Sequence, residues 1–110
     1  METIHDLISA VSALGIPWTN GVWGKGDDGP TVPYVTIKAG DGTSYGADNI
    51  TWCTVMDYDV ELYVHGRDYA LERALEQALD DAEIYWSKGV YLLEDESVCE
   101  TVYSVTVRED

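Results

Sequence analysis

Apolar residues recur every three or four positions in two segments of the chain, and this spacing predicts two amphipathic helices. The first helix spans residues 4–14. Thr3 is its N-cap, with Asp6 three residues on as an acidic variant of the capping box, and Gly15 and Pro17 end it. Its apolar stripe consists of Ile4, Leu7, Ile8, Val11 and Leu14. This pattern indicates a surface helix with one buried side.

The second helix is predicted to begin at its N-cap Asp68 and to end near Ala82. Its buried stripe consists of Leu71, Leu75, Ala78, Leu79 and Ala82, and its solvated side of Glu72, Arg73, Glu76, Gln77 and Asp80. Glu72 and Glu76 lie four residues apart on the outward side, with no His or Arg partner in the predicted helix face. We therefore expect both carboxylates to be solvated and to repel each other mildly, and not to act as an acid–base pair.

Strict alternation of apolar and polar residues predicts strands. It is clearest in residues 50–65, where Tyr58, Val60, Leu62 and Val64 alternate with Asp57, Asp59, Glu61, Tyr63 and His65. The first set is expected to face the core, and the second, acidic set is expected to face solvent. Further strands are predicted at 34–38, 84–93 and 98–107, and 18–32 is predicted as a loop or an irregular edge strand. The predicted fold is α+β, a four-stranded, mainly antiparallel (mixed) sheet with two helices packed on one face. Residues 1–110 are expected to form a single domain.

The segment Gly40–Asn49 contains Gly, Asp, Ser and Asn and lacks any hydrophobic period. It is too long for a tight hairpin turn and is predicted to be an exposed, mobile loop. Its oxygen-bearing residues Asp41, Asp48 and Asn49 do not have the spacing of a calcium-binding loop. No metal site is predicted here.

The charge balance is strongly acidic, with 21 Asp and Glu against 6 Lys and Arg and a net charge of −15. The few bases form no cluster, which argues against direct binding to nucleic acid or to an anionic membrane. No segment has the length of a membrane span, and the N-terminus lacks the basic start of a signal peptide, so a cytoplasmic site of synthesis with reduced Cys53 and Cys99 is expected.

There is no Phe, but eight Tyr and four Trp, residue types that suit a core or an interface.

Motifs for catalysis or cofactor binding are missing from the sequence. It has no phosphate-binding glycine loop, no paired cysteine motif and no nucleophile elbow. His5 and His65 are its two histidines, and both are expected to be surface residues. The chain is therefore predicted not to be an enzyme and to carry no cofactor.

Several short motifs in a fixed order resemble a known family over nearly the whole chain. The motifs are Gly15-Ile16-Pro17, Pro33-Tyr34-Val35, Ala47-Asp48-Asn49, Trp52, Glu61-Leu62-Tyr63, the Leu71/Leu75/Leu79 stripe, Ile84-Tyr85, and Tyr103, Val105 and Val107. Together they resemble the tail-completion or tail-terminator proteins (minor tail, head–tail joining) of long, flexible-tailed bacteriophages. The chain departs from the family pattern at its Trp-rich 18–23 segment and at Trp52, where the family more often has another aromatic.

The resemblance implies a structural role in the virion, at the head-proximal end of the tail. Such proteins form a ring, commonly of six copies, that caps the tail tube, ends its elongation and presents a docking surface to the head-completion or connector protein. The implied partners are other copies of the chain, the tube protein and the connector, and DNA passes through without specific binding. An acidic lumen suits that passage because it repels phosphates. Assembly in the host cytoplasm is expected.

The same resemblance places the assembly contact in the predicted 40–49 loop and the start of the next strand. The candidate interface residues are Asp41, Tyr45, Asp48, Asn49 and Trp52. Tyr45 is the expected anchor because it is the large aromatic of the predicted loop. The sequence leaves open whether the free protein is a monomer or already a ring.

An acidic DNA mimic that inhibits a DNA-binding host enzyme is the alternative function. It requires carboxylates spaced like phosphates along one exposed face, and Asp57, Asp59 and Glu61 fit that requirement as far as any half-exposed acidic strand does.

Overall fold

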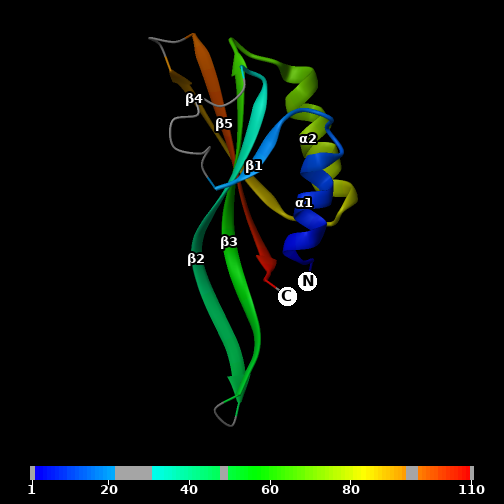
Figure 1. The fold of residues 1–110 in the computed structure, drawn as a ribbon, viewed down its shortest axis with the longest axis vertical. Helices are drawn as coiled ribbons and strands as arrows, with labels where there is room; N and C mark the ends of the chain where they lie inside the picture. The colour runs from blue at the N-terminus through cyan, green and yellow to red at the C-terminus, as the bar shows by residue number, and fades with distance from the viewer. Residues whose placement is uncertain (1, 22–30, 48–49, 94–96, 110) are drawn as a thin grey trace.

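The computed structural model describes residues 2–21, 31–47, 50–93 and 97–109. In chain order the elements are α1 (Ile4–Ser12), β1 (Trp18–Asn20), β2 (Tyr34–Ala47), β3 (Ile50–His65), α2 (Tyr69–Asp81), β4 (Trp86–Leu93) and β5 (Val98–Arg108). Figure 1 shows one twisted sheet with both helices on the same side of it. The predicted α+β class and the placement of the helices are confirmed.

The sheet has five strands in the order β1-β2-β3-β5-β4, where four were predicted. The additional strand is β1, a three-residue edge strand that runs parallel to β2. The backbone flanking β1 is held on both sides: the Pro17 carbonyl accepts the Val35 N–H at 2.9 Å, and the Gly21 N–H donates to the Ile37 carbonyl at 2.7 Å. The other strand pairs are antiparallel, so the sheet is mixed.

The predicted helix caps are present at both helix starts. Thr3 Oγ1 accepts the Asp6 N–H, and Asp6 Oδ2 accepts the Thr3 N–H at 2.8 Å, which completes the capping box. Asp68 Oδ1 accepts the Leu71 N–H at 3.0 Å at the start of α2. Gly15 has a φ of 73°, the left-handed conformation that ends a helix most easily at glycine. Neither described helix has the length and apolar content needed to cross a membrane.

The hydrophobic core lies between the helices and the sheet face turned toward them. Alternate residues of β3 and β5 meet the apolar stripes of α1 and α2 there, and full burial of each Leu or Val contributes about 1.5–3 kcal/mol. The fully buried members are Leu7, Val11, Val35, Ile37, Val60, Leu62, Leu75, Leu79, Cys99, Tyr103 and Val107. The predicted inward and outward sides of β3 are therefore confirmed for its apolar residues.

The predicted mobile loop at 40–49 is wrong for residues 40–47, which extend β2 and pair with the first half of β3. The pairing runs from Tyr34↔Tyr63 to Ala47↔Ile50 with two register shifts. Backbone N–H and C=O groups of one strand satisfy those of the other, so a strand pair does not require a hydrophobic period in its sequence. Asp48 and Asn49 lie outside the described residues. Residues 40–44 are exposed, as predicted.

Candidate assembly site

The far end of the β2–β3 hairpin leaves the body of the molecule as a two-stranded ribbon. Strand β1 hydrogen bonds to β2 only as far as Ile37. Strand β5 and Glu109, the residue after it, hydrogen bond to β3 only between Thr54 and His65. We call Gly40–Ala47 together with Ile50–Cys53 the distal arm. In Figure 1 the arm extends alone beyond both helices. A ribbon of two strands is only marginally stable in water without further packing, so the arm is suited to contact a partner.

Two backbone irregularities shape the arm. The register shifts between Ala39 and Gly42 and again between Tyr45 and Gly46, opposite Cys53 and Thr51. These are β-bulges, which bend a strand and increase its twist. At the first bulge, a Cβ on Gly40 would lie 3.3 Å from the Asp57 carbonyl oxygen, so glycine permits the close approach of the two strands.

Three of the five predicted interface residues lie on the two strands of the hairpin. Asp41 is exposed in the first bulge, Tyr45 is paired with Cys53, and Trp52 is the extra residue in the second bulge. Asp48 and Asn49 lie outside the described residues. The interface role of all five stays a prediction, now carried by a hairpin and not by a loop.

Strand β4 forms one edge of the sheet and carries exposed apolar side chains along its second half. The exposed fractions are 38% for Val90, 55% for Tyr91, 65% for Leu92 and 37% for Leu93. Sequence reasoning identified the strand but not its position, because the edge depends on β5 lying between β3 and β4. Exposed apolar edge strands favour pairing with another chain.

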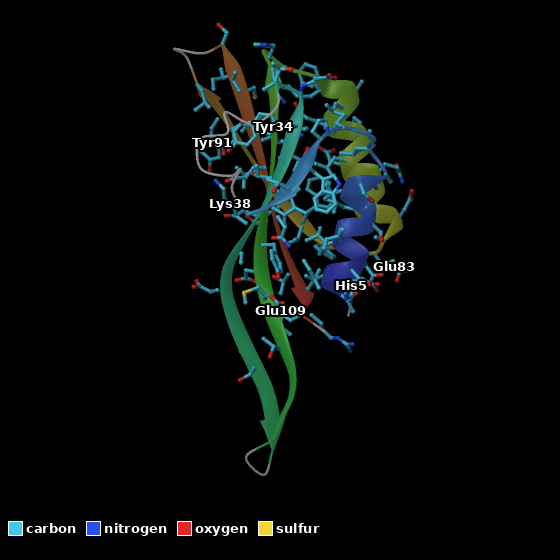
Figure 2. The ribbon with its side chains drawn as sticks, viewed as in Figure 1. His5, Tyr34, Lys38, Glu83, Tyr91 and Glu109 are labelled. Atoms are coloured by element: carbon cyan, nitrogen blue, oxygen red, sulfur yellow. The ribbon has the colours of Figure 1, made fainter. Side chains whose placement is uncertain are left out.

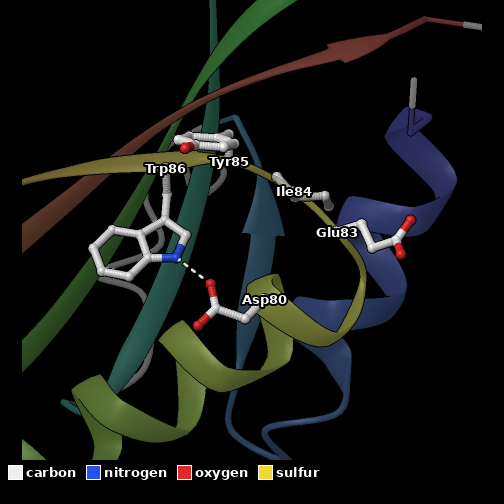
Figure 3. Close-up of a pocket in the computed structure, with 5 residues that line it drawn as sticks. All are labelled: Asp80, Glu83, Ile84, Tyr85 and Trp86. Atoms are coloured by element: carbon white, nitrogen blue, oxygen red, sulfur yellow. Dashed lines mark hydrogen bonds between the residues drawn. The ribbon is translucent and has the colours of Figure 1, made fainter.

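A shallow hollow of about 420 Å³ lies where α2 is connected to β4. Figure 3 shows its lining: Asp80, Glu83, Ile84, Tyr85 and Trp86, with Trp86 Nε1 donating to Asp80 Oδ1 at 2.9 Å. Tyr85 is 94% exposed. The lining supplies two aromatic side chains and two carboxylates but no histidine, cysteine or serine, so it offers a surface for contact.

The outer face, the side of the sheet turned away from the helices, is polar and acidic. Figure 2 shows Lys38 and Tyr91 on this side. Asp57 accepts a hydrogen bond from Thr106 Oγ1 at 2.7 Å, and Asp59 accepts one from Ser104 Oγ at 3.1 Å. Both carboxylates line a hollow of about 420 Å³ together with the arm residue Asp41. The surface beside the arm is therefore acidic.

Glu61 also belongs to the outer face, but the prediction that it is solvated is wrong. Its exposed fraction is 9%. Thr36 Oγ1 donates to Glu61 Oε1 at 2.7 Å, and Lys38 Nζ lies 3.0 Å from the same oxygen. Burial by itself raises the pKa of Glu61, but these hydrogen bonds and the lysine charge outweigh it and lower the pKa.

The largest correction concerns Glu72 and Glu76 of α2, which were predicted to be solvated and are 1% and 3% exposed. Lys88 Nζ, from β4, lies 2.9 Å from Glu72 Oε1 and 2.7 Å from Glu76 Oε2. Arg67, in the turn before α2, binds both oxygens of Glu72 at 3.0 Å. We call Glu72, Glu76, Lys88 and Arg67 the buried ion network.

Two further side chains complete the environment of Glu76. Tyr103 Oη donates to Glu76 Oε2 at 2.8 Å, and Arg73 Nη1 lies 3.2 Å from Glu76 Oε1. Burial raises the pKa of Glu72 and of Glu76, but the hydrogen bonds from their cationic partners outweigh it and hold both pKa values below the usual range. The carboxylates are therefore held ionised against β4 and β5, which indicates a structural role.

The two histidines are exposed, as predicted. Among residues 2–21, 31–47, 50–93 and 97–109, no group of three His, Cys, Asp or Glu side chains is placed to hold a metal ion. That the chain is not an enzyme stays a prediction.

Comparison with known proteins gives a likeness of fold. No family model matches the chain, and no curated protein matches it in sequence. A solved chain from the virion of a native gene transfer agent particle superposes with a TM-score of 0.59 at 13% identity, over 93% of this chain and 90% of that one. At this identity the likeness establishes a shared fold, which extends over nearly the full length of both chains.

Proposed function

We propose that this protein is a virion structural protein of a phage-like particle, and that it forms a ring that caps the tail tube. The observation that carries the proposal is the fold shared with a chain of a gene transfer agent virion over 93% of the present sequence. The order of motifs from Gly15-Ile16-Pro17 to Tyr103 supports the finer assignment to a tail-terminator role.

The surface of the molecule agrees with a role in assembly. A distal arm that pairs only with itself among the described residues gains stability from packing on a neighbour. An acidic outer face near the arm, with Asp41, Asp57 and Asp59, suits a ring through which DNA passes without adhering. In this proposal the partners are other copies, the tube protein and the connector.

The test combines light scattering with negative-stain microscopy of the purified chain, with and without tail tubes. The expected result is a ring, free or at one end of each tube, and tubes of limited length when the chain is present during their growth. A chain that stays monomeric in the presence of tubes and leaves their length unchanged contradicts the proposal.

The DNA-mimic alternative predicts a different result in the same samples. Asp57 and Asp59 stand two residues apart on the outer face, about 7 Å along the strand, which is close to the spacing of phosphates on one DNA strand. A mimic would bind a DNA-binding enzyme as a monomer, in competition with DNA, and would ignore tail tubes.

A further inference from the structure

We propose that neighbouring copies join by β-sheet addition, in which the outer edge of the distal arm of one copy pairs with the outer edge of β4 of the next. This inference rests on the proposed self-assembly and names the surfaces that form it. Both surfaces are strand edges whose outer backbone groups have no strand partner among the described residues. Unpaired edges bind an added strand through main-chain hydrogen bonds.

The β4 edge lacks the charged side chains that usually prevent such pairing. Its sequence, Trp-Ser-Lys-Gly-Val-Tyr-Leu-Leu, contains a single charge, Lys88. Lysine on an edge strand normally blocks a second chain. Here Lys88 Nζ is bound by Glu72 and Glu76 on the helix side of the sheet, so its charge is neutralised and directed away from the edge. The exposed apolar residues Val90–Leu93 remain.

The arm edge is similarly low in charge. Its β2 strand, Gly40–Ala47, contains Asp41 and otherwise only Gly, Thr, Ser, Tyr and Ala. Two copies that each carry −15 repel one another over most of their surfaces. Each of the two edges has a single charged residue, so the like charges that repel one another lie mostly outside the contact.

The two edges are also similar in length. Strand β4 has eight residues, and the β2 side of the arm beyond its first bulge, Gly42–Ala47, has six, so they extend about 26 Å and about 20 Å. The edge strand on the other side of the body, β1, has only three. An arm is therefore long enough to cover most of the β4 edge of a neighbour.

Pairing two different edges gives a head-to-tail contact in which every copy offers one arm and receives one. Such heterologous contacts close into a ring when the rotation between copies closes. Pairing of β4 with β4 would instead give a two-fold dimer, which stops at two copies and forms no ring.

Cysteine cross-linking tests the contact directly. Thr43→Cys on the arm is combined with Val90→Cys, Tyr91→Cys or Leu92→Cys in turn, in a Cys53→Ser background that retains the buried Cys99. The three positions on β4 scan the register. Mild oxidation of assembled protein is expected to convert the monomer band into a ladder of covalent multimers for at least one pair. Within one chain, Thr43 lies opposite Val55, whereas Val90 lies opposite Thr101 and is therefore level with Leu62, about 23 Å further along β3. A bond therefore reports on two chains.

Three control chains, two with Thr43→Cys and one with Val90→Cys alone, exclude chance collisions and contact between like edges. Thr43→Cys alone yields at most arm–arm dimers, and Thr43→Cys with Tyr69→Cys, which places a cysteine at a 66% exposed site on α2, yields no ladder. A ladder in the α2 control, or dimers of the single Val90→Cys chain in place of the ladder, overturns the proposal in favour of non-specific or β4–β4 contact.

A charge variant provides a second, independent measurement. Leu92→Lys places a free charge on the β4 edge at a site that is 65% exposed, and it is expected to abolish ring formation while the melting temperature of the body stays unchanged. Gln77→Lys, which adds the same charge to the exposed side of α2, is expected to form rings.

The outcomes separate this inference from the proposed function. Rings that form on tubes without a ladder at any β4 position, or that form with Leu92→Lys, overturn the edge pairing and leave the capping role standing. Absence of any ring from the unmodified chain overturns both.

Discussion

Lys88 neutralises two carboxylates that are almost fully buried, Glu72 and Glu76. Lys88→Met removes the charge and retains much of the apolar stem, so the two acids are left close together with less cationic compensation. Breaking a buried ion pair in this way costs about 3 kcal/mol of unfolding free energy. Urea unfolding at neutral pH measures it. Lys38→Met is the comparison variant, because Lys38 is 41% exposed and faces a single acid, Glu61, which keeps its hydrogen bond from Thr36, so a smaller loss is expected. Equal effects of the two variants would contradict a structural role for the network.

Thr101 is fully buried, and its hydroxyl has no hydrogen-bond partner among the described residues. Thr101→Val replaces this hydroxyl with a methyl group of similar shape and is expected to raise the unfolding free energy by about 1 kcal/mol. Thr36→Val is the control at a comparably buried site. The Thr36 hydroxyl binds Glu61, so its removal is expected to destabilise by about 1 kcal/mol. Thermal or urea unfolding distinguishes the opposite signs.

At the scale of elements, helix α2 contacts β4 and β5 through the carboxylates of Glu72 and Glu76, which bind Lys88 of β4 and Tyr103 of β5. Both acids have lowered pKa values. Burial raises the pKa of Glu72 and Glu76, but their cationic partners lower it below the usual value of 4.5. A carboxyl with a lowered folded pKa contributes its full stability above the unfolded pKa, and this contribution is lost as pH falls through the folded pKa. Unfolding free energy is therefore expected to fall below about pH 4.5. Glu76→Gln is expected to flatten this decline in urea titrations at successive pH values, and an unchanged decline would exclude Glu76 as a source.

The distal arm is separable from the body, because its strands pair only with each other among the described residues. Replacing Ser44–Thr54 with Asn-Gly joins the paired residues Thr43 and Val55 by a two-residue turn. The expected result is a body with a melting temperature within a few degrees of the parent and no ring or tube capping. Circular dichroism and negative-stain microscopy measure the two properties. Capping by the truncated chain would show that the arm is not the assembly contact.

At the scale of the whole molecule, 21 acids and 6 bases give each copy a net charge of −15. Self-repulsion opposes both folding and ring closure. Raising the salt concentration from about 0.01 M to about 1 M shortens the screening length from about 30 Å to about 3 Å. We expect a higher melting temperature and more ring by light scattering. KCl and NaCl at equal ionic strength are expected to act alike, and a response confined to one salt would indicate specific ion binding instead.

Local patterns were sufficient to predict most elements of the fold. The predicted strand at 50–65 has the bounds of β3, and the caps Thr3 and Asp68 lie where the sequence indicates them. Such features depend on residues within a few positions of one another, so they can be recognised in one sequence. The distal half of β2 was missed because Gly40–Ala47 has no period of its own and is ordered by pairing with β3.

The candidate site was predicted only in part, for a related reason. Asp41, Tyr45 and Trp52 were predicted to be interface residues, and this role stays a prediction. Their place on a protruding hairpin follows from the strand partner. The burial of Glu72 and Glu76 depends on Lys88, which is 12 residues beyond Glu76 in the chain. The position of Lys88 could have been predicted from the sequence. It alternates with Trp86 and Val90 along β4, so all three side chains lie on the helix-facing side of the sheet.

The sequence by itself determined the order of helices and strands, the acidic surface and the apolar core, because these follow from periodicity and composition. Tertiary structure alone decided which strand forms the edge, where the hairpin leaves the body and which acids are buried. These properties depend on strand order and on charges brought together from distant positions, and the free energy of burying a carboxylate is set by the cation that packs against it.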